Sequence, residues 1–383
     1  MQLKKISLTQ FKNYQFASFD FSERVVGICG LNGKGKTNLL DAIYYCCFAK
    51  SYFLKTDGLN IRFNNDGFRL ETFFENSEEQ QKIVCINRNV GKKELLLNDV
   101  PYGKFSEHIG KFPAVMIAPD DVAMIMDGSE ERRRYMDMVL CQLDDGYLQN
   151  LVTYNKVLQQ RNSLLKSFAE QGKTNWPLLE VLDEQLVEPG NFIYDKRKAF
   201  ASALIPLVEK FYMQIAANKE NITVEYESSL HKSSFYDLLN NFRQKDFLLQ
   251  RSNAGIHKDD LLFKLDGQVF KTTASQGQRK SLLFALKLAE FELLKANKGF
   301  APSCCWMMFL KSLMITVCTN CCIGFVMKMK DRCLLPIRIP RGCNRHLKTC
   351  RLITSLLNCD EDECLFKISG EAFTKHVLIV FID

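Results

Sequence analysis

The chain has 383 residues, enough for two domains with buried cores. Hydrophobic residues make up 46% and charged residues 25% of it, which is ordinary for a soluble globular protein. The first residues, Met1 to Lys5, lead into an alternating pattern instead of an apolar segment. This excludes a secretory signal peptide and predicts a cytoplasmic protein that does not enter a membrane.

The formal net charge of +7 is compatible with a nucleic-acid partner but does not require one. The cysteines are unevenly distributed: residues 1–300 hold 5 of the 15, and residues 301–383 hold the other 10. A cytoplasmic protein has little use for so dense a cysteine segment unless that segment binds metal. The last part of the chain therefore differs in kind from the rest.

The beginning of the chain predicts two strands, a glycine-rich loop and a helix. Spaced apolar residues predict a strand over residues 3–11, and a short β-branched run over residues 25–29 predicts a buried one. A loop at 30–37 and a helix at 38–45 follow, which is the context that a phosphate-binding loop requires. The apolar face of this helix would carry Leu39, Leu40, Ile43 and Cys47.

The middle of the chain changes from strands to long helices. Residues 61–118 are predicted to be mostly strands, and from about Asp120 to Gln250 the pattern predicts an inserted helical lobe. Strand character returns at residues 261–265, and a last helix is predicted from about Gln278 to Ala296. The residues at helical spacing in the lobe are Leu148, Leu151, Val152, Asn155, Leu158, Asn162 and Leu165.

The glycine-rich loop fits the P-loop pattern completely, with the sequence Gly30-Leu31-Asn32-Gly33-Lys34-Gly35-Lys36-Thr37. Its glycines let backbone N–H groups close around a β-phosphate, and the helix N-terminus adds partial positive charge there. We expect Lys36 to reach the β- and γ-phosphates and Thr37 to bind Mg²⁺ through its hydroxyl. The plainer alternative is a glycine-rich turn with a chance lysine.

A second loop, Ser275-Gln276-Gly277-Gln278, stands just before the last predicted helix. It places a hydroxyl and a bare backbone at a helix N-terminus, where a γ-phosphate can bind. Because the chain's own P-loop already holds a nucleotide, we expect the loop of one subunit to complete the nucleotide site of another. ATP would then join a head-to-head dimer. The alternative, that Ser275 caps the helix, is compatible with this role.

Six stretches resemble segments of the RecF family of ABC/SMC-type ATPases, in the same order along the chain. The chain departs from the family pattern at Glu130, near which a proline is usual, and at Ile256 and Lys258, where the family usually has Pro and Arg. The stretches are residues 11–14 (Phe-Lys-Asn-Tyr), 30–42, 119–122 with 128–137, 154–166, 255–261 and 275–278.

The resemblance implies an α/β fold, a P-loop ATPase head of the ABC/SMC type with a helical lobe inserted in it. It implies a homodimer that depends on ATP and Mg²⁺, binds single-stranded and gapped or duplex DNA, and works with RecO- and RecR-like partners. Its role would be recombinase loading in DNA replication, recombinational repair and the SOS response. The implied domains are the head at 1–119 and 251–302, the helical lobe at 120–250, and a tail at 303–383.

Two further features of the sequence each have a functional and a structural interpretation. The consecutive Arg132, Arg133 and Arg134 fit contacts to DNA phosphates, and equally well ion pairs with the neighbouring glutamates. His257 could sense a γ-phosphate or serve as a structural hydrogen-bonding group.

The carboxylates that an ABC-type ATPase needs are missing where they are expected. Soon after the serine loop, such a protein has four apolar residues, an Asp for Mg²⁺ and an acidic catalytic base. This chain has Ser303-Cys304-Cys305-Trp306-Met307-Met308 there, and no carboxylate follows before Asp331. Residues 377–382 followed by Asp383 have a similar pattern, which we interpret as chance because no base follows.

The genetic code offers an explanation. The six residues from Ser303 to Met308 can be encoded by TCN TGY TGY TGG ATG ATG. Regrouped from the third base, the codons become NTG YTG YTG GAT GAT, which encode Leu, Met or Val and then Leu-Leu-Asp-Asp. Our hypothesis is a one-base loss near the codons for Pro302 and Ser303, with reading in the wrong frame to Asp383. The Walker B strand and its acids would then be absent from this chain.

Several alternatives stay open for the tail and for the function. The tail could be a zinc-binding segment, or residues 304–327 a membrane segment interrupted by Lys311 and Asn320. The protein could be an ATP-gated DNA-binding module without enzymatic activity, or a subunit of another ABC-type ATPase. For the chain as written, we expect nucleotide binding without hydrolysis. We also expect aggregation, because the parallel sheet would lack a central strand. The candidate zinc ligands are Cys318, Cys321, Cys343, His346 and Cys350.

Overall fold

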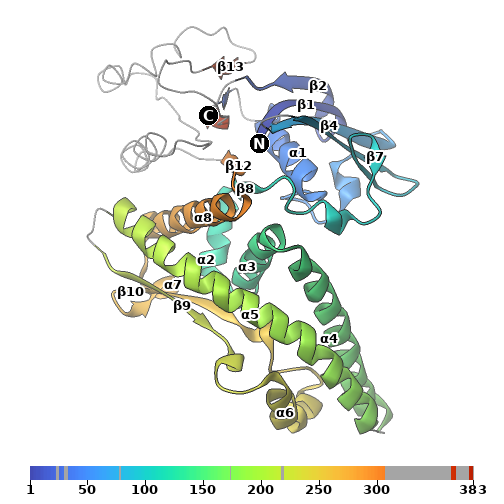
Figure 1. Cartoon of the computed structure of the whole chain (residues 1–383), viewed down its shortest axis with the longest axis vertical. Helices are drawn as coiled ribbons and strands as arrows, with labels where there is room; N and C mark the ends of the chain where they lie inside the picture. Colours follow the sequence, from blue (N-terminus) through green and yellow to red (C-terminus); the bar gives the residue numbers. More distant parts are fainter. Residues whose placement is uncertain are drawn as a thin grey trace. The chain divides into compact units, whose positions relative to one another are not determined.

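In the computed structural model, the chain folds into two compact units (Figure 1). The N-terminal unit comprises Met1–Asp120 together with Leu294–Asp383, and the helical unit comprises Asp121–Leu293. The residues that the structure describes are 1–22, 26–29, 33–76, 79–172, 174–216, 220–306, 364–367 and 379–382.

An antiparallel sheet of strand order β2-β1-β4-β5-β6-β7 forms one layer of the N-terminal unit. Its first strand carries the predicted alternation, since Leu3, Ile6, Leu8 and Phe11 are all buried. The strands are β1 (Gln2–Phe11), β2 (Tyr14–Asp20), β4 (Gly67–Asn76), β5 (Glu79–Arg88), β6 (Glu94–Leu97) and β7 (Val100–Pro101).

A second sheet of the same unit has the order β13-β3-β14-β12-β8. Strands β3, β14, β12 and β8 are parallel to one another, and β13 is antiparallel to β3. The strands are β3 (Val26–Cys29), β8 (Ala114–Ile117), β12 (Ser303–Trp306), β13 (Cys364–Lys367) and β14 (Ile379–Ile382).

The prediction that this sheet lacks a central strand is wrong. Strand β12 pairs with β8 from Ser303↔Ala114 to Trp306↔Ile117, and the Ser303 N–H donates to the Pro113 carbonyl at 2.9 Å. The ladder is made by backbone groups, so it does not depend on the side chains that the Walker B pattern requires. The buried Cys305 acts in it as a small apolar side chain.

Helix α1 (Lys36–Phe48) contacts strands of both sheets, namely β1, β4 and β5 of the first and β8 of the second. Every residue from Leu39 to Phe48 is buried. The four residues predicted for the apolar face are all buried, and the rest of the helix is buried too, because sheets cover it on two sides. The short 3-10 helices of this unit are η1 (Asp57–Asn60), η2 (Phe105–Glu107) and the start of η3 (Pro119–Val122).

The helical unit is built on two long helices, α4 and α5, which lie side by side (Figure 1). A three-stranded antiparallel sheet of order β11-β10-β9 packs with them, β9 contacting α5. The elements are α2 (Ala123–Met126), α3 (Ser129–Leu143), α4 (Asp145–Gln171), α5 (Trp176–Ile215), β9 (Ile222–Glu227), η4 (Ser229–His231), α6 (Phe235–Leu249), η5 (Ile256–Lys258), β10 (Asp260–Leu265), β11 (Gln268–Val269), α7 (Phe270–Thr273) and α8 (Gln276–Lys298).

The helix predicted around residues 148–165 exists as α4, but its buried stripe differs from the predicted one. Of the predicted positions Leu165 is fully buried, whereas Val152 is 59% exposed. The buried stripe includes an arginine and two tyrosines, which an apolar pattern does not detect. Its residues are Tyr147, Tyr154, Val157, Arg161, Leu165 and Phe168.

The boundaries of the two compact units differ from those of the predicted domains. Strand β10 pairs with β9 along its whole length, which places residues 251–293 with the helical unit. The boundaries predicted for the head and the lobe stay predictions. Among the helices within the described ranges, none is both long and apolar enough to cross a membrane.

Candidate nucleotide-binding site

The phosphate loop joins β3 to α1 in the N-terminal unit. Residues 30–32 lie outside the described residues, which resume at Gly33. Gly33 has φ +82° and Gly35 has φ +101°, left-handed conformations that glycine adopts without strain. In the described part of the chain, no side chain caps α1, and its first turn has no acidic residue. The helix N-terminus can therefore offer backbone N–H groups and partial positive charge to an anion.

The polar side chains of the loop lie where the P-loop pattern requires them. Lys34 is exposed, and Lys36 and Thr37 are half-buried in the first turn of α1. A lysine and a hydroxyl at these positions fit a triphosphate and its Mg²⁺, because Mg²⁺ prefers oxygen ligands. The described part of the loop therefore fits the predicted nucleotide.

The turn between β1 and β2 packs closely on the loop. The Tyr14 hydroxyl donates to the Gly35 carbonyl at 3.1 Å. A Cβ atom at Gly35 would lie 2.5 Å from Asn13 Nδ2 and 2.9 Å from the Tyr14 hydroxyl oxygen. Asn38 Nδ2, on α1, donates to Asn13 Oδ1 at 2.7 Å. Glycine is thus required at position 35 both by its backbone conformation and by this contact.

A buried carboxylate fixes α1 behind the loop. Asp41 has no exposed surface and accepts hydrogen bonds from Lys12 Nζ at 2.5 Å, from Ser51 Oγ at 2.6 Å and from the Tyr52 N–H at 2.7 Å. Lys12 is only 11% exposed, so the ion pair is largely withdrawn from water. The sequence reasoning missed Asp41, although an acidic residue inside an otherwise apolar helix was a usable signal.

The second predicted loop stands at the N-terminus of α8, and Ser275 and Gln276 are exposed. Ser275 Oγ accepts from the Gln278 N–H at 3.3 Å, and the Ser275 N–H donates to Gln278 Oε1 at 2.6 Å. These reciprocal bonds form a capping box. Gln278 Nε2 also donates to Glu220 Oε1 at 2.9 Å, and the Tyr212 hydroxyl donates to Glu220 Oε2 at 2.6 Å.

The two predicted nucleotide-binding loops lie in different units. The described part of the P-loop belongs to the N-terminal unit, and residues 275–278 belong to the helical unit. The capping of α8 by Ser275 leaves its hydroxyl hydrogen available, so the two predicted roles remain compatible.

The carboxyl ends of β3, β12 and β14 lie at one edge of the parallel sheet, because all three strands run in the same direction. The P-loop follows β3 at this edge. The residues after β12 are Met307 and Met308, and the residue after β14 is Asp383. All three lie outside the described residues.

Comparison with known proteins decides the family. A family model described as "AAA domain" matches residues 5–296. The DNA replication and repair protein RecF of Flavobacterium johnsoniae is 42% identical over 302 residues, which cover 79% of this chain and 84% of the relative. The chain belongs to the RecF family. RecF of Bacteroides fragilis is 40% identical over 303 residues, covering 79% of this chain and 81% of the relative.

A solved structure supports the same conclusion. The recombination mediator protein RecF with ATP in the RecFOR pathway is 29% identical, with a TM-score of 0.75, and the match covers 82% of this chain and 86% of that one. The same protein with ATPrS gives a TM-score of 0.74. The predicted fold class, an α/β P-loop ATPase head with an inserted helical lobe, is thereby confirmed.

The three consecutive arginines of this RecF-family chain all have partners within the helical unit. Arg132 makes a two-pronged contact with Asp260, from Nε to Oδ1 at 2.6 Å and from Nη2 to Oδ2 at 2.9 Å. Arg133 Nη1 donates to the Asp259 carbonyl at 2.7 Å. Arg134 pairs with Glu131 at 2.9 Å. Their contact with DNA stays a prediction.

His257 is held by hydrogen bonds on both ring nitrogens. Its Nδ1 accepts from the Tyr154 hydroxyl at 2.8 Å, and its Nε2 lies 3.1 Å from the Ser252 carbonyl, to which it can donate. Burial lowers the pKa of His257 to about 4, so the ring is neutral at physiological pH. This arrangement favours the structural role of His257 over that of a phosphate sensor.

Proposed function

We propose that the chain is a DNA replication and repair protein that binds ATP with Mg²⁺ and binds single-stranded and gapped or duplex DNA. The observation that carries the proposal is the close packing of the residue 11–14 turn on Gly35 and α1, which holds the end of a phosphate loop in shape. RecF relatives that share most of this chain are named as DNA replication and repair proteins. The cellular setting would be recombinational repair and the SOS response in the cytoplasm.

The nucleotide would be held by the loop backbone and by Lys36, with Thr37 as the protein ligand of Mg²⁺. The metal would supply charge neutralisation at the phosphates. Titration of the chain with a fluorescent ATP analogue tests this. Lys36→Ala should abolish the signal, and Lys50→Ala, at an exposed position after α1, should leave it unchanged. Equal binding by wild type and Lys36→Ala would contradict the proposal.

ATP would join two copies of the chain, with the Ser275 loop of one copy completing the nucleotide site of the other. The exposure of Ser275 and Gln276 at the start of a 23-residue helix supports this role. Light scattering after size exclusion tests it. The mass should double with ATP in the wild type and stay that of a monomer in Ser275→Arg, while both bind the ATP analogue. If Ser275→Arg also forms a dimer with ATP, the Ser275 loop does not complete the partner copy's nucleotide site.

Hydrolysis should be absent, because no carboxylate follows β12 before Asp331 and an ABC-type ATPase needs both a metal-binding Asp and a base there. A phosphate-release assay with ATP, Mg²⁺ and gapped DNA should stay at the background of Lys36→Ala. If the chain hydrolyses ATP and Asp383→Asn abolishes that activity, Asp383 serves as the metal-binding acid. The proposal that the chain lacks a Walker B motif would then be wrong.

The loss of Walker B would itself come from a one-base deletion in the gene. Sequencing the source DNA across the codons for residues 300–308 tests this. An extra base that restores Leu-Leu-Asp-Asp would mean that the natural protein retains the motif. The sequence as written would mean that the natural protein binds ATP without hydrolysing it.

RecO- and RecR-like proteins would be the partners, because the solved relatives are described as members of the RecFOR pathway. Together, these proteins and this chain would load a recombinase at gaps. Co-sedimentation with a purified RecR-like protein on gapped DNA, with and without ATP, tests the partnership. If the RecR-like protein sediments with the DNA equally well with and without this chain, the partnership is contradicted.

A further inference from the structure

Three cationic side chains gather around the segment that leads into β10. Arg251 and Lys258 are exposed, and Arg133 is half-buried. Two hydrogen bonds hold the residues beside Arg251 and Lys258 together and attach the Arg133 side chain to the segment. His257, next to Lys258, contacts the carbonyl of Ser252, next to Arg251, at 3.1 Å, and Arg133 Nη1 donates to the carbonyl of Asp259 at 2.7 Å. We call Arg133, Arg251 and Lys258 the cation cluster.

Among the described residues, none of the three side chains of the cation cluster forms an ion pair, although nearby acids attract Arg133 and Lys258 electrostatically. Three aspartates lie close in the sequence. Each of these is bonded to another arginine: Asp246 to Arg161 at 2.7 Å, Asp259 to Arg197 at 3.0 Å, and Asp260 to Arg132 at 2.6 Å.

Lys258 lies among other positive charges. Its pKa is lowered by partial burial and then by Arg251 and Arg133, while Asp246 raises it. The pKa of Arg133 is lowered by burial and then by Arg197, while Asp260, Asp259 and Glu130 raise it. Like charges held close without an anion destabilise the fold, and a bound anion would remove this cost. The positive surroundings of Lys258 therefore favour a bound anion.

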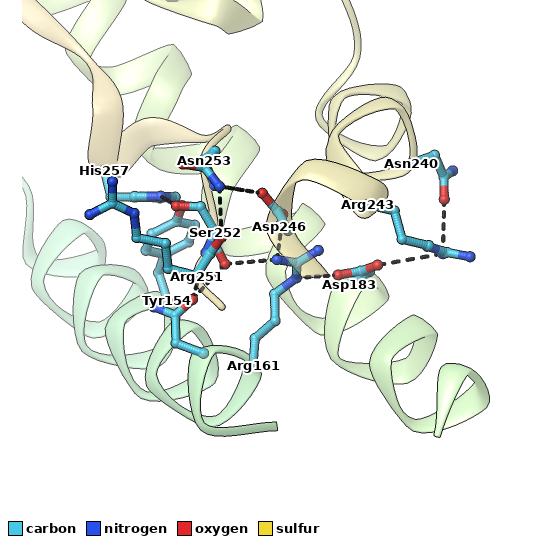
Figure 2. A network of polar contacts seen from close by, with 11 residues as sticks. Tyr154, Arg161, Asp183, Asn240, Arg243, Asp246, Arg251, Ser252, Asn253 and His257 are labelled. Carbon is cyan, nitrogen blue, oxygen red and sulfur yellow. Dashed lines mark hydrogen bonds and ion pairs between the residues drawn. The ribbon is translucent and has the colours of Figure 1, made fainter. Parts of the chain in front are cut away.

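A buried network fixes the segment that carries Arg251 (Figure 2). Arg161 on α4 is fully buried and donates from Nε to Asp183 Oδ1 at 2.5 Å, and from Nη1 to Ser252 Oγ at 2.8 Å. Asp246 Oδ1 accepts from the N–H and the Nδ2 of Asn253, both at 2.9 Å. The network ties the residues after Arg251 to α4, α5 and α6, so the segment is held rigidly beside the helices.

We propose that the cation cluster binds phosphates of a nucleic-acid backbone. The inference rests on the proposed DNA binding and gives it a place on the helical unit. It also distinguishes among the three consecutive arginines: Arg132 and Arg134 are ion-paired to acids, and Arg133 is not. Guanidinium and ammonium donors without acidic partners are the groups that hold DNA phosphates.

The test compares salt dependence of DNA binding in the full chain. The affinity for a fluorescein-labelled gapped duplex is measured by anisotropy between low and moderate salt. Each lost phosphate contact lowers the slope of log K against log salt by about 0.9, so Arg251→Gln/Lys258→Gln should lower it by about 2. The matched control Lys156→Gln/Lys166→Gln removes the same charge from exposed positions on α4 and should leave the slope unchanged.

A charge-conserving variant separates charge from shape. Arg251→Lys/Lys258→Arg should keep the wild-type slope, and loss of the slope in this variant would overturn the inference. If the wild type binds DNA and Arg251→Gln/Lys258→Gln keeps its slope, the inference falls while the proposed function stands. An acidic protein segment would then be the better ligand class. If the wild type does not bind the duplex, the proposed function itself falls, and the cluster's assignment with it.

Discussion

At the scale of single residues, Gly35 joins the sequence to the nucleotide site. Its φ of +101° is required by the loop, and its missing Cβ admits Asn13 and Tyr14 from the β1–β2 turn. The P-loop pattern predicted the glycine. It did not predict the second reason for it, because that reason is a contact with residues more than twenty positions earlier in the chain.

Gly35→Ala should destabilise the chain more than Gly33→Ala does. Both positions have positive φ, which costs a residue with a Cβ about 1 kcal/mol. At Gly33 a Cβ would meet no atom within 4 Å, whereas at Gly35 it would lie 2.5 Å from Asn13 Nδ2. The free energy of unfolding in urea measures both. Equal losses would show that the turn yields freely, and Asn13→Ala should restore part of the loss of Gly35→Ala.

A buried histidine should make stability depend on pH. His108 has no exposed surface, and burial lowers its pKa from 6.5 to about 4. Between these values the unfolded chain binds a proton that the folded chain does not, so stability falls as pH falls from about 6.5 to 4. The contribution lost between pH 7 and pH 5 is on the order of 2 kcal/mol.

Urea unfolding at pH 7 and pH 5 checks this. The difference should shrink in His108→Asn and stay unchanged in His231→Asn, whose ring is exposed. His108→Asn should also be less stable at pH 7, because His108 Nε2 contacts the Cys46 carbonyl at 2.7 Å. A pH difference as large in His108→Asn as in the wild type would assign it to other groups, such as His257, whose pKa burial also lowers to about 4.

At the scale of elements, the start of α8 is held by more than its capping box. Gln278 joins Ser275 to Glu220, and Glu220 joins Tyr212 on α5. The sequence predicted the cap of this helix from four adjacent residues. It could not predict Glu220, which lies 58 positions before Gln278 and has no pattern of its own.

Glu220→Ala should loosen the Ser275 loop without unfolding the unit. Removing the carboxylate frees Gln278, so the amides of residues 276–279 should exchange with deuterium faster. Glu225→Ala is the matched control, because Glu225 pairs with Lys264 on the small sheet, away from Gln278. Unchanged exchange in Glu220→Ala would mean that the capping box alone fixes the loop.

Helix α4 shows a limit of periodicity at the same scale. The pattern of leucines predicted the helix, yet the side chains that are fully buried include Tyr154 and Arg161. Arg161 is buried because Asp183 and Asp246 from two other helices reach it. A buried ion pair depends on partners from elsewhere in the fold, so no window of sequence around Arg161 can reveal it.

At the scale of the whole molecule, the last segment of the chain takes part in the parallel sheet. Strand β14 lies between β3 and β12, and β3 and β8 do not pair with each other. Deletion of residues 303–383 would therefore dissolve the sheet and expose its backbone edges. The N-terminal unit depends on the segment although no carboxylate follows β12 before Asp331.

The truncated chain should melt at a lower temperature than the full chain and bind more of a hydrophobic dye. Differential scanning calorimetry and dye fluorescence measure the two effects. The melting of the full chain in the same buffer is the control. Identical melting of both chains would show that β12 and β14 contribute nothing to the stability of the N-terminal unit.

The sequence by itself determined the P-loop, the serine loop, most of the strands and helices, and the absence of acids from residue 303 to residue 330, because each of these is encoded in adjacent residues. The tertiary structure decided what surrounds them: Asp41 behind the loop, Glu220 behind Ser275, and the pairing of β12 with β8. It also decided which of the consecutive arginines form ion pairs, namely Arg132 and Arg134. These outcomes depend on contacts between distant segments, and the energy of such a contact is fixed by burial and geometry, which arise only when the chain has folded.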